Sequence, residues 1–165
     1  MEQKTVTSHL IKGIVIAVVL MLLNFFVRRQ GGVTLPFILQ LLPTIIVLAG
    51  VIASCLMFGS QTGGQMIRGD IFAHGFKTTV MVSFLMAVYT YIVVKFVFPH
   101  GDAEVEEAVK ILVKQGNMME SEARRQATEG IKKAWLFDVG GAIFGTLIPG
   151  VVGSFIGAGF AKKKS

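Results

Sequence analysis

The chain has 165 residues, which is enough for one compact unit. Hydrophobic residues make up 53% of the chain and charged residues only 16%, whereas a typical soluble domain carries about 25% charged residues. The formal net charge is +6, but the basic residues flank the apolar runs instead of forming one patch, which argues against a nucleic-acid partner and favours membrane anchors.

The first two apolar runs predict membrane-spanning helices over residues 10–27 and 35–58. Lys12 stands at the start of the first run, where its stem can snorkel to the membrane surface. The second run contains Pro43, which we expect to kink the helix, and the single cysteine, Cys55, which we expect to be buried as a small hydrophobe. It also carries small residues spaced for close helix approach, namely Ala49, Gly50, Ala53 and Ser54.

Residues 59–75 are polar and contain several glycines, so we interpret them as a connection. A third span is predicted over residues 76–98, closing at Pro99, and a fourth over residues 135–161. Between them, residues 102–133 form a charged amphipathic helical hairpin, in which apolar positions recur at i, i+3, i+4 and i+7. Its charges nearly balance, so we do not expect a basic lipid-binding patch. The hairpin is a solvated connection, a cap on the bundle or a docking element for a partner.

Small residues recur every fourth position in the fourth span, in the pattern of a glycine zipper: Gly141, Gly145, Gly153 and Gly157, with Pro149 and Ala161 in the same register. Helices in a bilayer associate through close packing, and glycine allows the backbones to approach. The stripe has two interpretations. It packs against the small face of the second span within one chain, or it forms the seam of a homo-oligomer.

Two charged residues lie about one helical turn inside the membrane. Asp138 follows Trp135, which we expect to be an interfacial anchor, by one turn, and Lys95 stands just inside the end of the third span. An intramembrane charge is costly unless it is paired or hydrated, so we hypothesise an ion pair between Lys95 and Asp138. The alternatives are independent snorkelling and a proton-coupling role for Asp138.

The four spans predict that both termini lie on the same side of the membrane. The basic residues on the two sides nearly balance, so the orientation is decided by the triple lysine at residues 162–164, which favours cytoplasmic termini. We expect a multi-pass protein of the inner (plasma) membrane.

The pattern between Gly63-Gly64 and Phe98-Pro99 carries a family resemblance. The glycine pair precedes an amphipathic lead-in over residues 71–76, and the span that follows contains Tyr89-Thr90-Tyr91. A hairpin with a Met-Met-Glu step and a last span ending in lysines come next. In this layout the chain resembles an uncharacterised family of small four-span membrane proteins abundant in Bacteroidota. The resemblance implies an inner-membrane protein, and it brings no catalytic or binding residue, because the family has no assigned activity.

These observations predict an all-α protein with a single membrane domain over residues 1–165, built from four transmembrane helices and the hairpin. His9, His74 and His100 are scattered along the chain, so we expect no enzyme, metal site or cofactor. The favoured function is a non-enzymatic scaffold or accessory subunit, partnered by the bilayer and by its own copies or a larger membrane complex. A minimal oligomeric transporter or channel is the alternative, and a membrane-lesion protein is a third reading.

Overall fold

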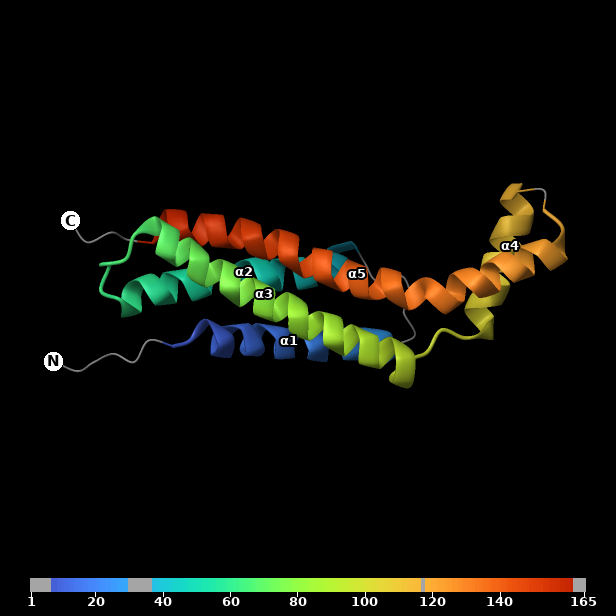
Figure 1. Ribbon diagram of the computed structural model, residues 1–165, viewed down its shortest axis with the longest axis horizontal. Coiled ribbons are helices and arrows are strands. Elements are labelled where there is room, and N and C mark those ends of the chain that lie inside the picture. The colour runs from blue at the N-terminus through green and yellow to red at the C-terminus, as the bar shows by residue number, and fades with distance from the viewer. Residues whose placement is uncertain (1–6, 30–36, 117, 162–165) are drawn as a thin grey trace. The chain divides into compact units, whose positions relative to one another are not determined.

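The computed structural model describes residues 7–29, 37–116 and 118–161, and these residues are predominantly helical. The helices are α1 (His9–Arg29), α2 (Phe37–Gln61), α3 (Arg68–Ile92), the short π-helix η1 (Val93–Val97), α4 (Asp102–Gly116) and α5 (Glu120–Phe160) (Figure 1). The predicted all-α class is therefore confirmed. The expected start of the second span near residue 35 and the triple lysine at residues 162–164 lie outside the described residues.

Within the described ranges, four helical segments are long and apolar enough to cross a membrane: His9–Arg29, Leu41–Gln61, Arg68–Val97 and Glu120–Phe160. Helices α2 and α5 continue through Pro43 and Pro149, respectively. In a soluble protein a proline inside a helix is strongly destabilising, whereas spans packed against other helices tolerate it. The chain is therefore a helical membrane protein by length and composition of its helices.

The third span begins earlier than its apolar run. We expected a polar connection over residues 59–75, but α2 continues to Gln61 and α3 begins at Arg68. The chain reverses at Gly63 and Gly64, whose φ angles of 66° and 74° favour glycine. The Ile67 carbonyl then accepts from the Asp70 and Ile71 amides and opens α3. The start of this helix was mistaken for a connection because one of its polar residues, His74, faces other helices, as described below.

The chain divides into two compact units, residues 1–87 with 142–165, and residues 88–141. In the first unit, α1 begins and α5 ends at the same end, where α2 also ends and α3 begins (Figure 1). Its buried apolar side chains come from all four helices: Ile16, Ala17, Leu20, Val47, Val51, Cys55, Ile71, Val82, Met86 and Ala158. Large apolar side chains also cover its outside, including Phe84 and Phe155, as expected where lipid replaces water.

Glycines set the closest helix approaches in the first unit. A Cβ added to Gly13 of α1 would lie 3.2 Å from the Thr78 carbonyl oxygen of α3. One added to Gly50 of α2 would lie 2.9 Å from Ile16 Cδ1 of α1. One added to Gly75 of α3 would lie 2.8 Å from Ser154 Oγ of α5. Side chains at these positions would push the helices apart, so the close packing here requires glycine.

The second unit holds the end of α3, η1, α4 and the first part of α5. In the wide turn of η1, the Phe98 amide donates to the Val93 carbonyl over 2.8 Å, and Pro99 follows directly. Helix α4 packs on α5 through a small apolar core of Val109, Ala123 and Ala127, flanked by Val105, Ala108, Leu112 and Met118. The second arm of the expected hairpin is continuous with the fourth span, in one helix of 41 residues.

Candidate functional site

A buried polar cluster lies at the end of the first unit where α1 begins. Lys12 of α1 is 8% exposed, and its Nζ donates to the Ser54 carbonyl of α2 over 3.2 Å. The same Nζ lies 3.3 Å from Nε2 of His74 on α3, which is also 8% exposed. A charged ammonium has only donors, so Nε2 must accept and the proton of a neutral His74 ring is on Nδ1. The side chain expected to snorkel instead links three helices.

Aromatic rings and hydroxyls hold His74 in place. The ring stacks on Phe58 of α2, with centroids 4.1 Å apart and planes 9° from parallel, and meets the His9 ring edge-on at 6.0 Å. One turn along α3, Thr78 Oγ1 donates to the His74 carbonyl over 3.0 Å and lies 3.1 Å from Ser54 Oγ. His74 is therefore contacted from α1, α2 and its own helix.

Beside this cluster, a cavity of about 410 Å³ is lined by His9, Phe58, Met66, Asp70, Ala73, His74 and Lys77. Its ionisable side chains come from α1 and α3, and Phe58 closes it from α2. Asp70 and Lys77 are exposed, whereas His74 is buried. A cavity with convergent polar groups is the usual form of a small-molecule site.

A second hydrogen bond between helices lies deeper in the first unit. Thr146 Oγ1 of α5 bonds to Ser83 Oγ of α3 over 2.8 Å. The hydroxyls of Thr79 and Ser154 donate hydrogen bonds to backbone carbonyls one turn earlier in their own helices, those of Gly75 and Gly150. Such bonds satisfy hydroxyls in an apolar surrounding, and across helices each contributes on the order of 1 kcal/mol.

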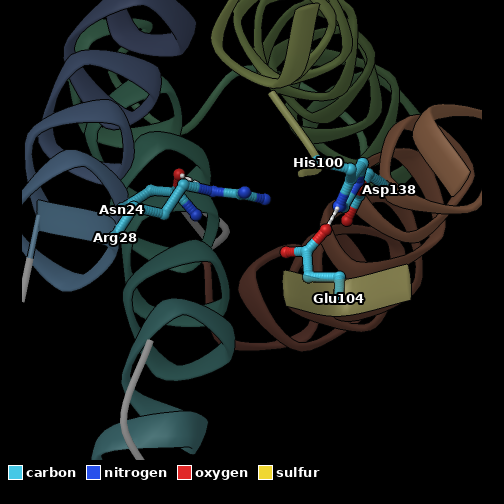
Figure 2. Close-up of polar contacts among 5 residues, drawn as sticks. All are labelled: Asn24, Arg28, His100, Glu104 and Asp138. Atoms are coloured by element: carbon cyan, nitrogen blue, oxygen red, sulfur yellow. Dashed lines mark hydrogen bonds and ion pairs between the residues drawn. The ribbon is translucent and has the colours of Figure 1, made fainter. Parts of the chain in front are cut away.

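In the second unit, one histidine bridges two carboxylates. His100 lies in the segment before α4, with Nδ1 2.6 Å from Glu104 of α4 and Nε2 2.8 Å from Asp138 of α5 (Figure 2). Burial lowers the pKa of His100, but the hydrogen bonds to Asp138 and Glu104 outweigh this effect and raise the pKa above its ordinary value. Ionised carboxylates only accept, so the doubly protonated form of the ring satisfies both of them and joins the two helices.

The two residues of the hypothesised ion pair each have another contact. Asp138 is bonded to His100, and Lys95 Nζ lies 5.0 Å from the centroid of the Trp135 ring, in cation–π geometry. Tyr91 meets the same ring edge-on at 5.5 Å. Lys95, His100 and Trp135 also line a cavity of about 230 Å³. The pairing of Lys95 with Asp138 stays a prediction.

The residues of the predicted glycine zipper have unlike surroundings. A Cβ added to Gly153 would lie 3.0 Å from the Leu48 carbonyl oxygen, and one added to Gly157 would lie 2.6 Å from Cys55 Cβ, so both glycines pack on α2. At Gly141 and Gly145, both exposed, an added Cβ would meet no atom within 4 Å.

The face of α2 that Gly153 and Gly157 meet is not the small-residue face that we expected to be complementary. It is formed by Leu48, Val51, Ile52 and Cys55. Of the expected face, Ala49 and Ala53 are exposed, Gly50 lies against Ile16 of α1, and Ser54 is buried beside Thr78. Residues at i and i+4 share a helix face, and successive residues are about 100° apart around the helix. Residues next to each other in the sequence therefore face different neighbours, so α2 presents Val51 and Cys55 to α5 and turns Ala49 and Ala53 outward.

Sequence reasoning missed Lys12 and His74 as a pair. They are 62 positions apart, and the sequence placed one at a span end and the other in a connection. The available signal was the lysine within the first apolar run, because an ionisable residue inside a span needs a partner. Among the described residues, no group of three or more His, Cys, Asp or Glu side chains is arranged to hold a metal ion.

A family model described as a protein of unknown function, DUF4199, matches residues 10–163. The chain belongs to this family. No curated protein and no solved structure matches it. Apart from His9, the match covers all four spans, the hairpin and both polar clusters.

Proposed function

We propose that the protein is a non-enzymatic scaffold or accessory subunit that presents one face of α5 to another membrane helix. The observation that carries this proposal is the difference between the two halves of the glycine zipper. Gly153 and Gly157 are covered by α2, whereas Gly141 and Gly145 are exposed and have open space above Cα. The open half therefore offers a packing surface that the chain does not use itself.

The physical reason is the weak driving force for association in lipid. Apolar side chains gain little by leaving the acyl chains, so helices associate where small residues permit close backbone contact. Phe144 and Ile148 are more than half exposed and flank Gly145. They form ridges beside a groove of glycine, into which the side chains of a partner helix would pack. A second copy and a different membrane protein would both fit this description.

A minimal oligomeric transporter or channel remains the second candidate. Buried polar side chains in the first unit favour it, above all Lys12, His74 and Ser83. However, the hydroxyls described above are engaged with backbone carbonyls or with one another. This engagement is a better match to helix packing than to a hydrated path.

We place the protein in the inner (plasma) membrane with both termini in the cytoplasm, as the lysines at 162–164 favour. The start of α1 and the end of α5 at one end of the first unit support termini on a common side (Figure 1). We also expect that other members of the family have four spans and that the family is abundant in Bacteroidota.

The test compares three leucine substitutions in α5 by gentle-detergent pull-down from the native membrane and native mass determination. Gly145→Leu should leave folded protein but reduce the recovered complex at least about tenfold, a loss of about 1.4 kcal/mol. Gly153→Leu should reduce the yield of folded protein, because its side chain meets Leu48 and Val51. Gly159→Leu is the matched control, because Gly159 is open but lies off the zipper register.

An unchanged complex with Gly145→Leu would contradict the proposed surface. A stoichiometric second protein lost only with Gly145→Leu would support the accessory role and identify the complex. A homo-oligomer lost in the same way would support self-association, and solute or ion flux into vesicles containing that oligomer would favour the transporter.

A further inference from the structure

The cavity beside His74 lies where a membrane surface is expected. Helix α3, from Arg68 to Ile92, has 25 residues, which at about 1.5 Å per residue is about 38 Å long. The hydrocarbon core of a bilayer is about 30 Å thick, so the ends of this helix reach the headgroups. The cavity is lined from the first residue of α1 and from the first turns of α3, His9, Asp70 and His74. It is therefore placed at headgroup depth.

Positive and proton-donating groups converge on this cavity. Lys77 stands exposed on its wall, and His9 and His74 line it as well. Behind His74 is the buried ammonium of Lys12. Among the residues that the structure describes, no carboxylate lies within ion-pair distance of Lys12 or Lys77. A buried cation is costly without compensating charge, so the site favours an anion.

One residue that lines the cavity, Asp70, is acidic, and this narrows the class of ligand that the cavity can bind. Asp70 lies on α3 two turns before Lys77, so both face the cavity from the same helix side. A carboxylate opposes a simple anion but stabilises an ammonium group. The volume of about 410 Å³ falls in the range of small-molecule pockets, roughly 300–1,000 Å³, and exceeds what one phosphate ion fills.

We propose that this cavity binds the headgroup of an amine-bearing phospholipid, of the phosphoethanolamine type. Lys77 and the Nδ1–H of His74 donate hydrogen bonds to the phosphate, and the Asp70 carboxylate accepts a hydrogen bond from the ammonium group of the lipid. Lys12 acts through His74, because its bond to Nε2 fixes the proton on Nδ1. Phe58 stacks on the imidazole and keeps its plane in position. This lipid site is separate from the proposed helix-packing face of α5 and does not depend on it.

The experiment is a native mass titration of the purified, delipidated full-length protein in detergent. Its ligands are short-chain phosphatidylethanolamine, short-chain phosphatidylglycerol, soluble phosphoethanolamine and inorganic phosphate. We expect one phosphatidylethanolamine per chain, bound at least about tenfold more tightly than the other three. Lys77→Gln should weaken this binding about tenfold. Lys77 is exposed, so the variant should keep the wild-type melting temperature.

Two further variants complete the test. Asp70→Asn should make phosphatidylglycerol bind as well as phosphatidylethanolamine, because the ammonium loses its carboxylate. Lys110→Gln removes an exposed lysine of α4 that lines none of the described cavities, and it should bind like wild type. Equal weakening by Lys110→Gln and Lys77→Gln would overturn the site, because it would show only diffuse attraction between charges. Inorganic phosphate or soluble phosphoethanolamine binding as tightly as the lipid would overturn the lipid assignment.

Discussion

Lys12 combines a buried ammonium with partners that are neutral. Its Nζ contacts the Ser54 carbonyl and the His74 ring, and its stem runs through the apolar start of α1. Removing one partner from a buried charge costs more than removing the charge itself, because the charge is then left unsatisfied. The two members of the pair therefore differ in what their loss should do.

We predict that His74→Leu lowers the free energy of unfolding by about 1–3 kcal/mol, because Lys12 loses an acceptor. Lys12→Met should cost less, and the double variant should cost less than the sum of the two single changes. Reversible unfolding in mixed micelles, followed by circular dichroism, measures all three. Strictly additive losses would show that the 3.3 Å contact does not couple the residues.

His100 gives the second unit a dependence on pH. Its pKa is raised above 6.5 in the folded protein by the bonds to Asp138 and Glu104, which outweigh the opposing effect of burial. A group whose pKa is higher when folded contributes stability that is fully present below its unfolded pKa. That contribution is lost as the pH rises through the folded-state pKa.

We therefore expect the wild-type melting temperature to fall as the pH is raised from 6 through the folded-state pKa of His100. His100→Gln keeps a side chain that forms hydrogen bonds but does not titrate, so its melting temperature should be lower at pH 6 and less dependent on pH. Differential scanning fluorimetry in buffered detergent measures both curves. The same pH dependence in the two proteins would assign it to other groups.

At the scale of elements, α4 depends on one narrow contact. Ala123 and Ala127 of α5 are buried under Val109, and the apolar rim around them is small. Arg124 and Glu106 add an ion pair of 2.7 Å, but both side chains are about half exposed, so it contributes little. Small residues on α5 allow α4 to approach closely enough to exclude water.

We predict that Ala123→Glu detaches α4 from α5, because a carboxylate cannot be buried against Val109 without a partner. Limited proteolysis should then cut within residues 98–119 at least about ten times faster than in the wild type. The free energy of unfolding of the first unit should change by less than about 1 kcal/mol, because the two units are separate compact units. Lys114→Ala, an exposed position of α4, is the control. Unchanged cleavage of Ala123→Glu would contradict the packing role.

At the scale of the whole molecule, four spans predict a simple topology. An even number of crossings returns the chain to its starting side, and residues between the third and fourth spans then lie on the opposite side. The basic residues on the two sides nearly balance, so the triple lysine at residues 162–164 decides the predicted orientation.

We expect a periplasmic reporter enzyme to be inactive when fused after residue 165 and active when inserted near residue 116. A cytoplasmic reporter at the same two points should give the reverse pattern. An active periplasmic reporter at 165 would overturn cytoplasmic termini, and equal activity at both points would overturn the number of crossings.

The sequence by itself determined the class of this protein, because continuous apolar runs of sufficient length leave few alternatives to membrane-crossing helices. It also predicted the hairpin, since the 3.6-residue period of Val105, Ala108, Val109 and Leu112 is a local property. The predicted connection over residues 59–75 was wrong from Arg68 onwards, because α3 begins there and the sequence cannot show that His74 contacts Lys12 of another helix.

Only the tertiary structure decided which residues meet. Periodicity placed Gly141, Gly145, Gly153 and Gly157 on one face, but it does not say which part of that face another helix contacts, so it could not separate the covered pair from the open pair. Contacts between distant residues depend on how each helix is rotated and shifted against its neighbours. That is why Lys12 with His74, and His100 with Asp138, emerged only from the fold.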